Sequence, residues 1–156
     1  MKHITILGIG HLKESYWKQA ETEYIKRLSP YIKISIIEKK EEMFRSTQER
    51  KNIQQKEAET ILPFIQKFDM VIALSEDGKQ YDSPQFAQML KKNTTHGEKI
   101  LFIIGGPLGL DDSIKQAVHI SISLSHLTFP HQMVRTILLE QLYRAETILL
   151  GKQYHY

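Results

Sequence analysis

Five short apolar segments alternate along the chain with segments whose apolar residues recur at helical spacing, and this alternation most constrains the fold. The expected strands are residues 3–9, 32–38, 69–74, 99–106 and 119–125. The expected helices cover residues 14–28, a stretch ending near Phe64, a stretch starting at Ser83-Pro84, a short stretch from Asp111-Asp112, and residues 131–149. Strands that alternate with helices form βαβ units. The sequence therefore predicts an α/β fold with a mostly parallel sheet and flanking helices.

The length of 156 residues suits one domain, 1–156, and no repeat or linker interrupts it. There is no cysteine, which excludes disulfides and thiolate metal sites, and no His, Asp or Glu set has zinc spacing, so no metal is expected. The first apolar run is interpreted as a strand rather than a signal peptide. Because no apolar run approaches membrane-spanning length, we expect a cytoplasmic protein without membrane contact.

The formal net charge of +3 arises within residues 1–33, and the rest of the chain is balanced. A surface that binds a polyanion would therefore involve the first expected helix and its flanks. An ordinary solvated helix face explains the same charges equally well. The charge alone therefore does not distinguish a polyanion-binding surface from a solvated one.

Three expected strands end in unusual segments: Leu74-Ser75, the glycine turn "GGPLGL" at 105–110, and "LSHLTFPHQM" at 124–133. In open parallel sheets, ligands bind beyond the carboxyl ends of the strands. We therefore expect the three segments to meet in one pocket that is partly apolar and partly lined by backbone amides. The glycine turn matches neither the dinucleotide fingerprint nor the phosphate loop, and a simple tight turn is the alternative reading.

The expected last helix carries apolar residues on more than one face, so it must bury two faces. One face would pack on the sheet, and the other needs a partner, most simply the same helix of a second subunit. A helix buried centrally within a monomer is the alternative. Arg144 on this helix could form a structural ion pair or belong to a catalytic site.

Several segments together resemble the family of ribosomal large-subunit pseudouridine methyltransferase H, whose members are small SPOUT-class, S-adenosylmethionine-dependent RNA methyltransferases. The segments are "YWKQAETEYIKRL", "IIGGPLGL", "SLSHLTFPHQMVRTILLEQLYRAETI" and the terminal "YH". The resemblance implies a SPOUT-type fold with a C-terminal trefoil knot that holds the methyl donor, and a homodimer. It also implies a reaction, methylation of N3 of a pseudouridine in a stem-loop of large-subunit (23S) rRNA on assembled ribosomes.

The same resemblance implies the site residues. The donor-binding positions, for S-adenosylmethionine, are Leu74, Gly105, Leu124, Ser125, His126, Leu127, Thr128 and Phe129. The implied catalytic residues are Arg144, Tyr154 and His155, across the dimer seam, with Arg144 beside the negative charge that develops on the uracil ring. His131 and Arg135 are secondary candidates that would shape the pocket or steer phosphate.

Two features depart from the family pattern. The tail reads "QYHY", with Gln153 and Tyr156, where the family has Pro-Tyr-His followed by Lys or Arg, and His11 stands where a basic residue is usual. Both departures remove positive charge from expected RNA-facing positions. The affinity for the RNA target is therefore less constrained than donor binding. Two alternatives also stay open: a SPOUT methyltransferase acting on another RNA such as tRNA, and a non-catalytic dimeric RNA-binding module with a vestigial donor pocket.

Overall fold

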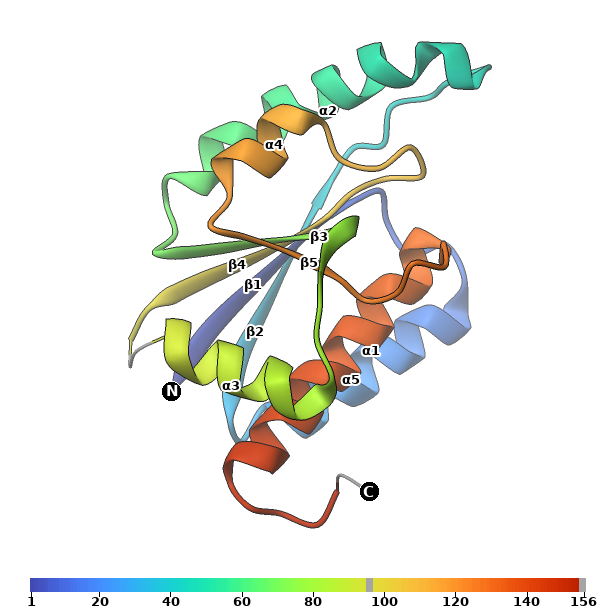
Figure 1. The fold of residues 1–156 in the computed structure, drawn as a ribbon. Helices are drawn as coiled ribbons and strands as arrows, with labels where there is room; N and C mark the ends of the chain where they lie inside the picture. The colour runs from blue at the N-terminus through green and yellow to red at the C-terminus, as the bar shows by residue number, and fades with distance from the viewer. Residues whose placement is uncertain (95–96, 155–156) are drawn as a thin grey trace.

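The computed structural model describes residues 1–94 and 97–154, and within them it shows a five-stranded sheet flanked by helices (Figure 1). The strands are β1 (Lys2–Ile9), β2 (Ile32–Lys39), β3 (Met70–Gln80), β4 (Lys99–Ile104) and β5 (Ile120–Ser123). The helices are α1 (Ser15–Leu28), the 3₁₀ helix η1 (Thr47–Glu49), α2 (Arg50–Ile65), α3 (Ser83–Asn93), α4 (Asp112–Ala117) and α5 (His131–Leu149). The strand order is β2-β1-β4-β3-β5, and each neighbouring pair is parallel.

Helices cover both faces of the sheet, as a parallel sheet requires (Figure 1). Helices α1, α3 and α5 lie on one face, and α2 and α4 lie on the other. Successive strand residues point to opposite faces, so Ile4 and Ile6 pack in the first core while Leu7 and Ile9 pack in the second. The predicted α/β class is confirmed, with a sheet that is wholly parallel, and the C-terminal knot stays a prediction.

Helix α5 packs between α1 and α3 on one face of the sheet (Figure 1). Its residues Leu138, Leu139 and Leu142 are fully buried in the core that these helices share with the sheet. Other apolar residues of α5, including Ile137, Tyr143 and Ile148, are only partly buried. The rest of the chain therefore covers one side of α5 and leaves part of its apolar surface accessible, and the homodimer stays a prediction.

The sequence "SEDGK" at 75–79 predicts a turn after the third expected strand, and the structure corrects this prediction. Strand β3 continues to Gln80, and Leu74 and Lys79 both pair with Ile122 of β5, so residues 75–78 bulge out of the ladder. A Cβ on Gly78 would lie 2.5 Å from the carbonyl carbon of Ile122. Only glycine allows β3 to return to β5 at this distance.

Two smaller expectations also change. The N-cap of α3 is Asp82 rather than Ser83, because the Asp82 carboxylate accepts a hydrogen bond from the backbone N–H of Gln85 at 2.7 Å. The charged tract 38–52 has no apolar periodicity, which predicts an irregular loop, but η1 and the start of α2 fall within it. Within residues 1–94 and 97–154, no helix is long and apolar enough to cross a membrane.

The close contact at Gly78 predicts a large cost for a small substitution. We expect Gly78→Ala to lower the free energy of unfolding by about 2–3 kcal/mol, because the added methyl group forces β3 away from β5. Gly8→Ala in β1 is the matched control, since its Cβ would meet nothing nearer than the Arg135 guanidinium carbon at 4.0 Å. Its effect should stay below about 1 kcal/mol in urea denaturation. Equal effects of the two substitutions would contradict this account of the bulge.

Candidate functional site

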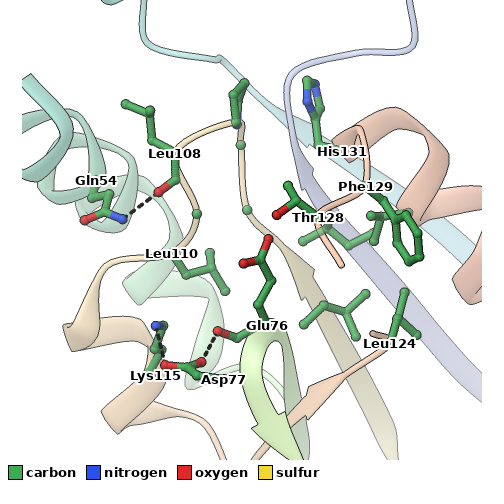
Figure 2. Close-up of a pocket in the computed structure, with 18 of the residues that line it drawn as sticks. Gln54, Glu76, Asp77, Leu108, Leu110, Lys115, Leu124, Thr128, Phe129 and His131 are labelled. Carbon is green, nitrogen blue, oxygen red and sulfur yellow. Dashed lines mark hydrogen bonds and ion pairs between the residues drawn. The ribbon is translucent and has the colours of Figure 1, made fainter. Parts of the chain in front are cut away.

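A cavity of about 500 Å³ lies at the carboxyl edge of the neighbouring strands β4, β3 and β5 (Figure 2). The three unusual strand ends meet in it, so the expected convergence is observed. The lining includes seven of the eight expected donor positions, which are Leu74, Gly105, Leu124, Ser125, Leu127, Thr128 and Phe129. His126 is the eighth and does not line the cavity. The role of these residues in binding a donor stays a prediction.

One wall of the cavity is the main chain of the glycine turn after β4. A Cβ on Gly105 would lie 3.0 Å from the carbonyl carbon of Gly109 and 3.1 Å from Cγ of Leu110, so the turn folds tightly onto itself. The amide of Gln54 on α2 donates a hydrogen bond to the Leu108 carbonyl at 2.7 Å (Figure 2). Gly109 has a φ of +79°, which favours glycine. The turn is thus fixed from two sides and presents backbone to a ligand.

Another wall is the segment after β5, which side-chain hydroxyls hold in place. The Ser123 hydroxyl donates to the Ser125 carbonyl, and the Ser125 hydroxyl accepts from the Leu127 backbone N–H, both at 3.0 Å. Leu127 nevertheless remains 73% exposed. These bonds shape the segment locally while leaving an apolar side chain on its surface.

Charged residues that the sequence analysis did not single out line the remaining side of the cavity. They are Arg50, Glu76, Asp77, Asp112 and Lys115. The Lys115 ammonium lies 3.0 Å from the Asp77 carboxylate, which also accepts a hydrogen bond from the Ser75 hydroxyl (Figure 2). The bond from Ser75, and then that from Lys115, lower the pKa of Asp77. Glu76 and Asp77 directly follow Leu74, where the third strand was expected to end, and this signal would have identified them had residues 75–79 not been interpreted as a turn.

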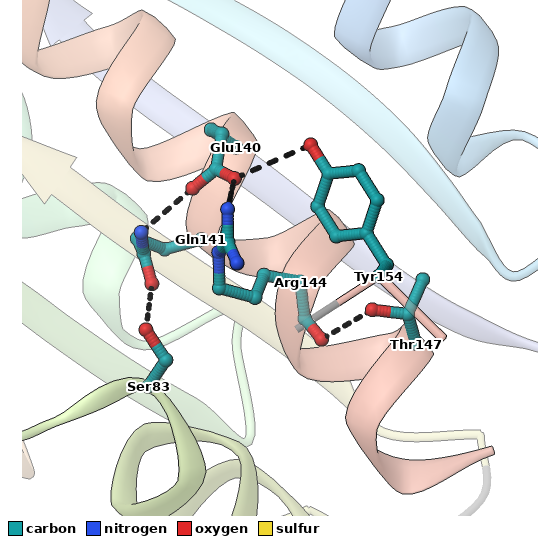
Figure 3. Close-up of polar contacts among 6 residues, drawn as sticks. All are labelled: Ser83, Glu140, Gln141, Arg144, Thr147 and Tyr154. Atoms are coloured by element: carbon teal, nitrogen blue, oxygen red, sulfur yellow. Dashed lines mark hydrogen bonds and ion pairs between the residues drawn. The ribbon is translucent and has the colours of Figure 1, made fainter. Parts of the chain in front are cut away.

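Arg144 and Tyr154 form a separate cluster around Glu140 (Figure 3). The Arg144 guanidinium lies 2.6 Å from the Glu140 carboxylate and stacks over the Tyr154 ring, 4.9 Å from its centroid. The Tyr154 hydroxyl donates to the same carboxylate at 3.5 Å. The hydrogen bond to Glu140 raises the pKa of Arg144, so this side chain stays cationic. Neither Arg144 nor Tyr154 lines the cavity, and His155 lies outside the described residues.

The geometry of α5 keeps this cluster away from the cavity of the same chain. His131, at the start of α5, lines the cavity, and Arg144 lies on the same uninterrupted helix. The helical rise of 1.5 Å per residue puts the two residues about 20 Å apart along the axis. One chain therefore does not bring the expected donor-binding and catalytic residues together.

The structure places the two secondary candidates, Arg135 and His131, in different surroundings. Arg135 is 4% exposed and is ion-paired with Glu38 at 2.9 Å and Glu21 at 3.2 Å, which joins α5 to β2 and α1. The expectation that Arg135 steers phosphate is therefore wrong for this arrangement. Its ion pairs instead hold α5 against β2 and α1. His131 does shape the cavity, and burial lowers its pKa, so its imidazole is neutral at neutral pH.

The wholly parallel sheet and the backbone-walled cavity at its carboxyl edge define an α/β protein with a site for a ligand of cofactor size. Residues 1–155 match the family model described as "Predicted SPOUT methyltransferase". The chain therefore belongs to the SPOUT methyltransferase family, a class of S-adenosylmethionine-dependent enzymes.

Two solved structures share the fold at low sequence identity. A probable methylase family protein from Haemophilus influenzae Rd KW20 is 11% identical, with a TM-score of 0.53 over 98% of this chain and 68% of that one. TrmJ from Z. mobilis ZM4 is also 11% identical, with a TM-score of 0.51 over 94% of this chain and 70% of that one. At this identity the likeness supports the fold alone.

Behind the glycine turn, α2 buries the carboxyl group of Glu57. A Cβ on Gly106 would lie 3.4 Å from Oε1 of Glu57, which accepts a weak hydrogen bond from the Glu42 backbone N–H, also at 3.4 Å. Burial raises the pKa of Glu57 to about 7, and the neighbouring carboxylates Glu41 and Glu42 add to the shift. Ionising Glu57 therefore places an uncompensated charge against the turn that walls the cavity.

This shift predicts how stability depends on pH. The ordinary pKa of this carboxyl is 4.5, so between pH 4.5 and about 7 the folded state holds a proton that the unfolded chain has released. The free energy of unfolding should therefore fall as pH rises through this window. We expect Glu57→Gln to flatten this dependence and to raise stability at about pH 8 by about 2 kcal/mol, measured by urea denaturation. Glu59→Gln, an exposed carboxylate on the same helix, should leave the slope unchanged; a slope insensitive to Glu57 would refute the assignment.

Proposed function

We propose that the chain methylates N3 of a pseudouridine in a stem-loop of large-subunit rRNA on assembled ribosomes, with S-adenosylmethionine as the methyl donor. The observation that carries the proposal is that seven of the eight positions implied by the family resemblance line one cavity. The reaction would take place in the cytoplasm, where assembled ribosomes are found.

The cavity fits the donor in size and chemistry. Its volume of about 500 Å³ lies within the range of pockets that hold ligands of this size. Leu110, Leu124 and Phe129 offer apolar contact for a flat base, and Gly105 lets the main chain approach the ligand closely. Arg50, on the α2 side of the glycine turn, suits the carboxylate of the amino-acid end. When bound, S-adenosylmethionine supplies a methyl group on a cationic sulfur, so the protein mainly positions the reactants and excludes water.

Arg144 is the proposed electrostatic group at the acceptor. Removal of the N3 proton leaves negative charge on the uracil ring, and a fixed cation beside that charge stabilises the transition state. Glu140 and the Tyr154 ring hold the guanidinium in one orientation. Tyr154, and His155 beyond the described residues, are the proposed partners of Arg144 in the tail.

The separation of the two clusters supports a homodimer in which each active site uses both subunits. Arg144 lies about 20 Å along α5 from the cavity of its own chain, so a second chain has to supply it. Leu127 at the cavity and Tyr16 on α1 are large exposed apolar side chains, 73% and 58% exposed, and a second subunit could cover them.

Methyl transfer assays distinguish the proposed substrate from its alternatives. Purified protein is incubated with labelled donor and with ribosomes that lack the modification, free rRNA or tRNA. We expect label in 70S particles, and mass mapping should place it at N3 of a pseudouridine. Label in tRNA but not in ribosomes would favour another RNA, which the missing charges at His11 and Tyr156 leave open. Absence of donor binding in calorimetry at millimolar donor would favour a non-catalytic RNA-binding module.

Replacement of Arg144 should separate catalysis from donor binding. We expect Arg144→Ala to reduce methyl transfer at least about 100-fold, because the developing charge loses its cation, and to change donor affinity by less than about twofold. Lys67→Ala is the control, because Lys67 is an exposed cation 4.8 Å from the Phe64 ring centroid, just after α2, which covers the face of the sheet opposite α5 (Figure 1). A comparable loss of transfer in the control would mean that Arg144 acts only through local structure or general charge.

Mixed dimers test whether subunits share active sites. Gly105→Val should distort the turn that walls the donor cavity, because a Cβ there would lie 3.0 Å from the carbonyl carbon of Gly109. Arg144→Ala should block catalysis. Coexpressed together, the two inactive variants should recover about a quarter of wild-type activity, since half of the randomly formed dimers contain one intact site. If each chain builds its own site, coexpression should recover no activity.

A further inference from the structure

Glu76 is a carboxylate in the cavity for which the proposed mechanism has no use. It lies on the bulge of residues 75–78, and in Figure 2 its side chain points into the cavity between Leu110 and Thr128. In the part of the chain that the structure describes, no hydrogen bond or ion pair engages this carboxylate. The side chain is exposed, so it is available to a bound ligand.

The bulge that carries Glu76 is held on both sides. Ser75 and Lys115 both bind the Asp77 carboxylate, which ties the bulge to α4. Gly78 brings the chain back against the backbone of Ile122 on β5. Glu76 is therefore presented from a fixed backbone rather than from a loose loop.

The charges that line the cavity leave an excess of negative charge near Glu76. Asp77 and Lys115 neutralise each other at 3.0 Å. Of the remaining charged lining residues, Glu76 and Asp112 are acidic and Arg50 is basic. Arg50 lies on the α2 side of the glycine turn, where a Cβ on Gly109 would be 3.7 Å from its guanidinium. The bulge side of the cavity thus favours a cation.

We propose that Glu76 selects the cationic methyl donor over the neutral product, a role that rests on the proposed methyltransferase function. Transfer breaks the bond between sulfur and the methyl carbon and leaves its electron pair on sulfur, while the acceptor nitrogen forms a bond to the methyl carbon and loses its proton to water. The sulfonium of S-adenosylmethionine thereby becomes the uncharged thioether of S-adenosylhomocysteine. The two ligands share all other charges, so a carboxylate beside the sulfur favours binding of the donor over the product.

Calorimetry with both ligands tests the proposal without an activity measurement. We expect Glu76→Gln to weaken binding of S-adenosylmethionine by about five- to tenfold and to change binding of S-adenosylhomocysteine by less than about twofold, since a nearby charge in partly aqueous surroundings contributes on this order. Glu59→Gln makes the same change of charge on the exposed surface of α2 and should leave both affinities unchanged. Thermal unfolding should show that the three proteins are equally folded.

The other outcomes overturn the proposal in distinguishable ways. An equal loss of affinity for both ligands would mean that Glu76 binds a group they share, such as a ribose hydroxyl, and not the charge on sulfur. Unchanged affinities would show that the carboxylate does not face the ligand. If the wild-type protein binds donor but Glu76→Gln behaves like Glu59→Gln, only the role of Glu76 fails. If the wild-type protein binds neither ligand, the proposed function fails, and this inference fails with it.

Discussion

The site depends on the parallel pairing of β4, β3 and β5. Leu74 of β3 pairs with Ile104 of β4 on one side and with Ile122 of β5 on the other, so the three strands end at the same level. Neighbouring strands lie about 5 Å apart, and the chain segments that follow them therefore start side by side. An antiparallel β5 would send its following segment to the opposite edge, and the cavity would lose one wall.

The continuous helix α5, which starts at the cavity, keeps Arg144 away from it. Helix α5 begins at the cavity wall and continues without a break to the cluster around Glu140. A straight helix packed between α1 and α3 cannot bend its C-terminal half back to the cavity. The proposed homodimer would bring Arg144 of one chain to the donor cavity of the other. The partly buried apolar residues of α5, such as Ile137 and Tyr143, are compatible with such a contact.

The sequence predicted the parts of the fold that depend on local periodicity. The alternation of strands and helices, the five strands and the meeting of three strand ends followed from apolar spacing and from the geometry of parallel sheets. The bulge at residues 75–78 was missed because Asp77-Gly78 looks like a turn, and only the distant β5 draws the chain back into the sheet. The charged lining was missed for a similar reason, since Arg50 reaches the cavity from a tract with no pattern of its own. Buried partners, such as the carboxylates that fix Arg135, depend on tertiary contacts that periodicity does not encode.

Main chain and side chains contribute differently to this cavity. The turn at Gly105 and Gly109 fixes its shape through backbone contacts, which leave little room for any added side chain. Such a wall can recognise the shape of a ligand and its hydrogen-bonding edges, but it carries no net charge. A distinction between two ligands of nearly equal shape and different charge therefore has to come from the charged side. The bulge supplies that side from within the sheet, where Asp77 and Lys115 hold it in place and leave Glu76 exposed to the cavity.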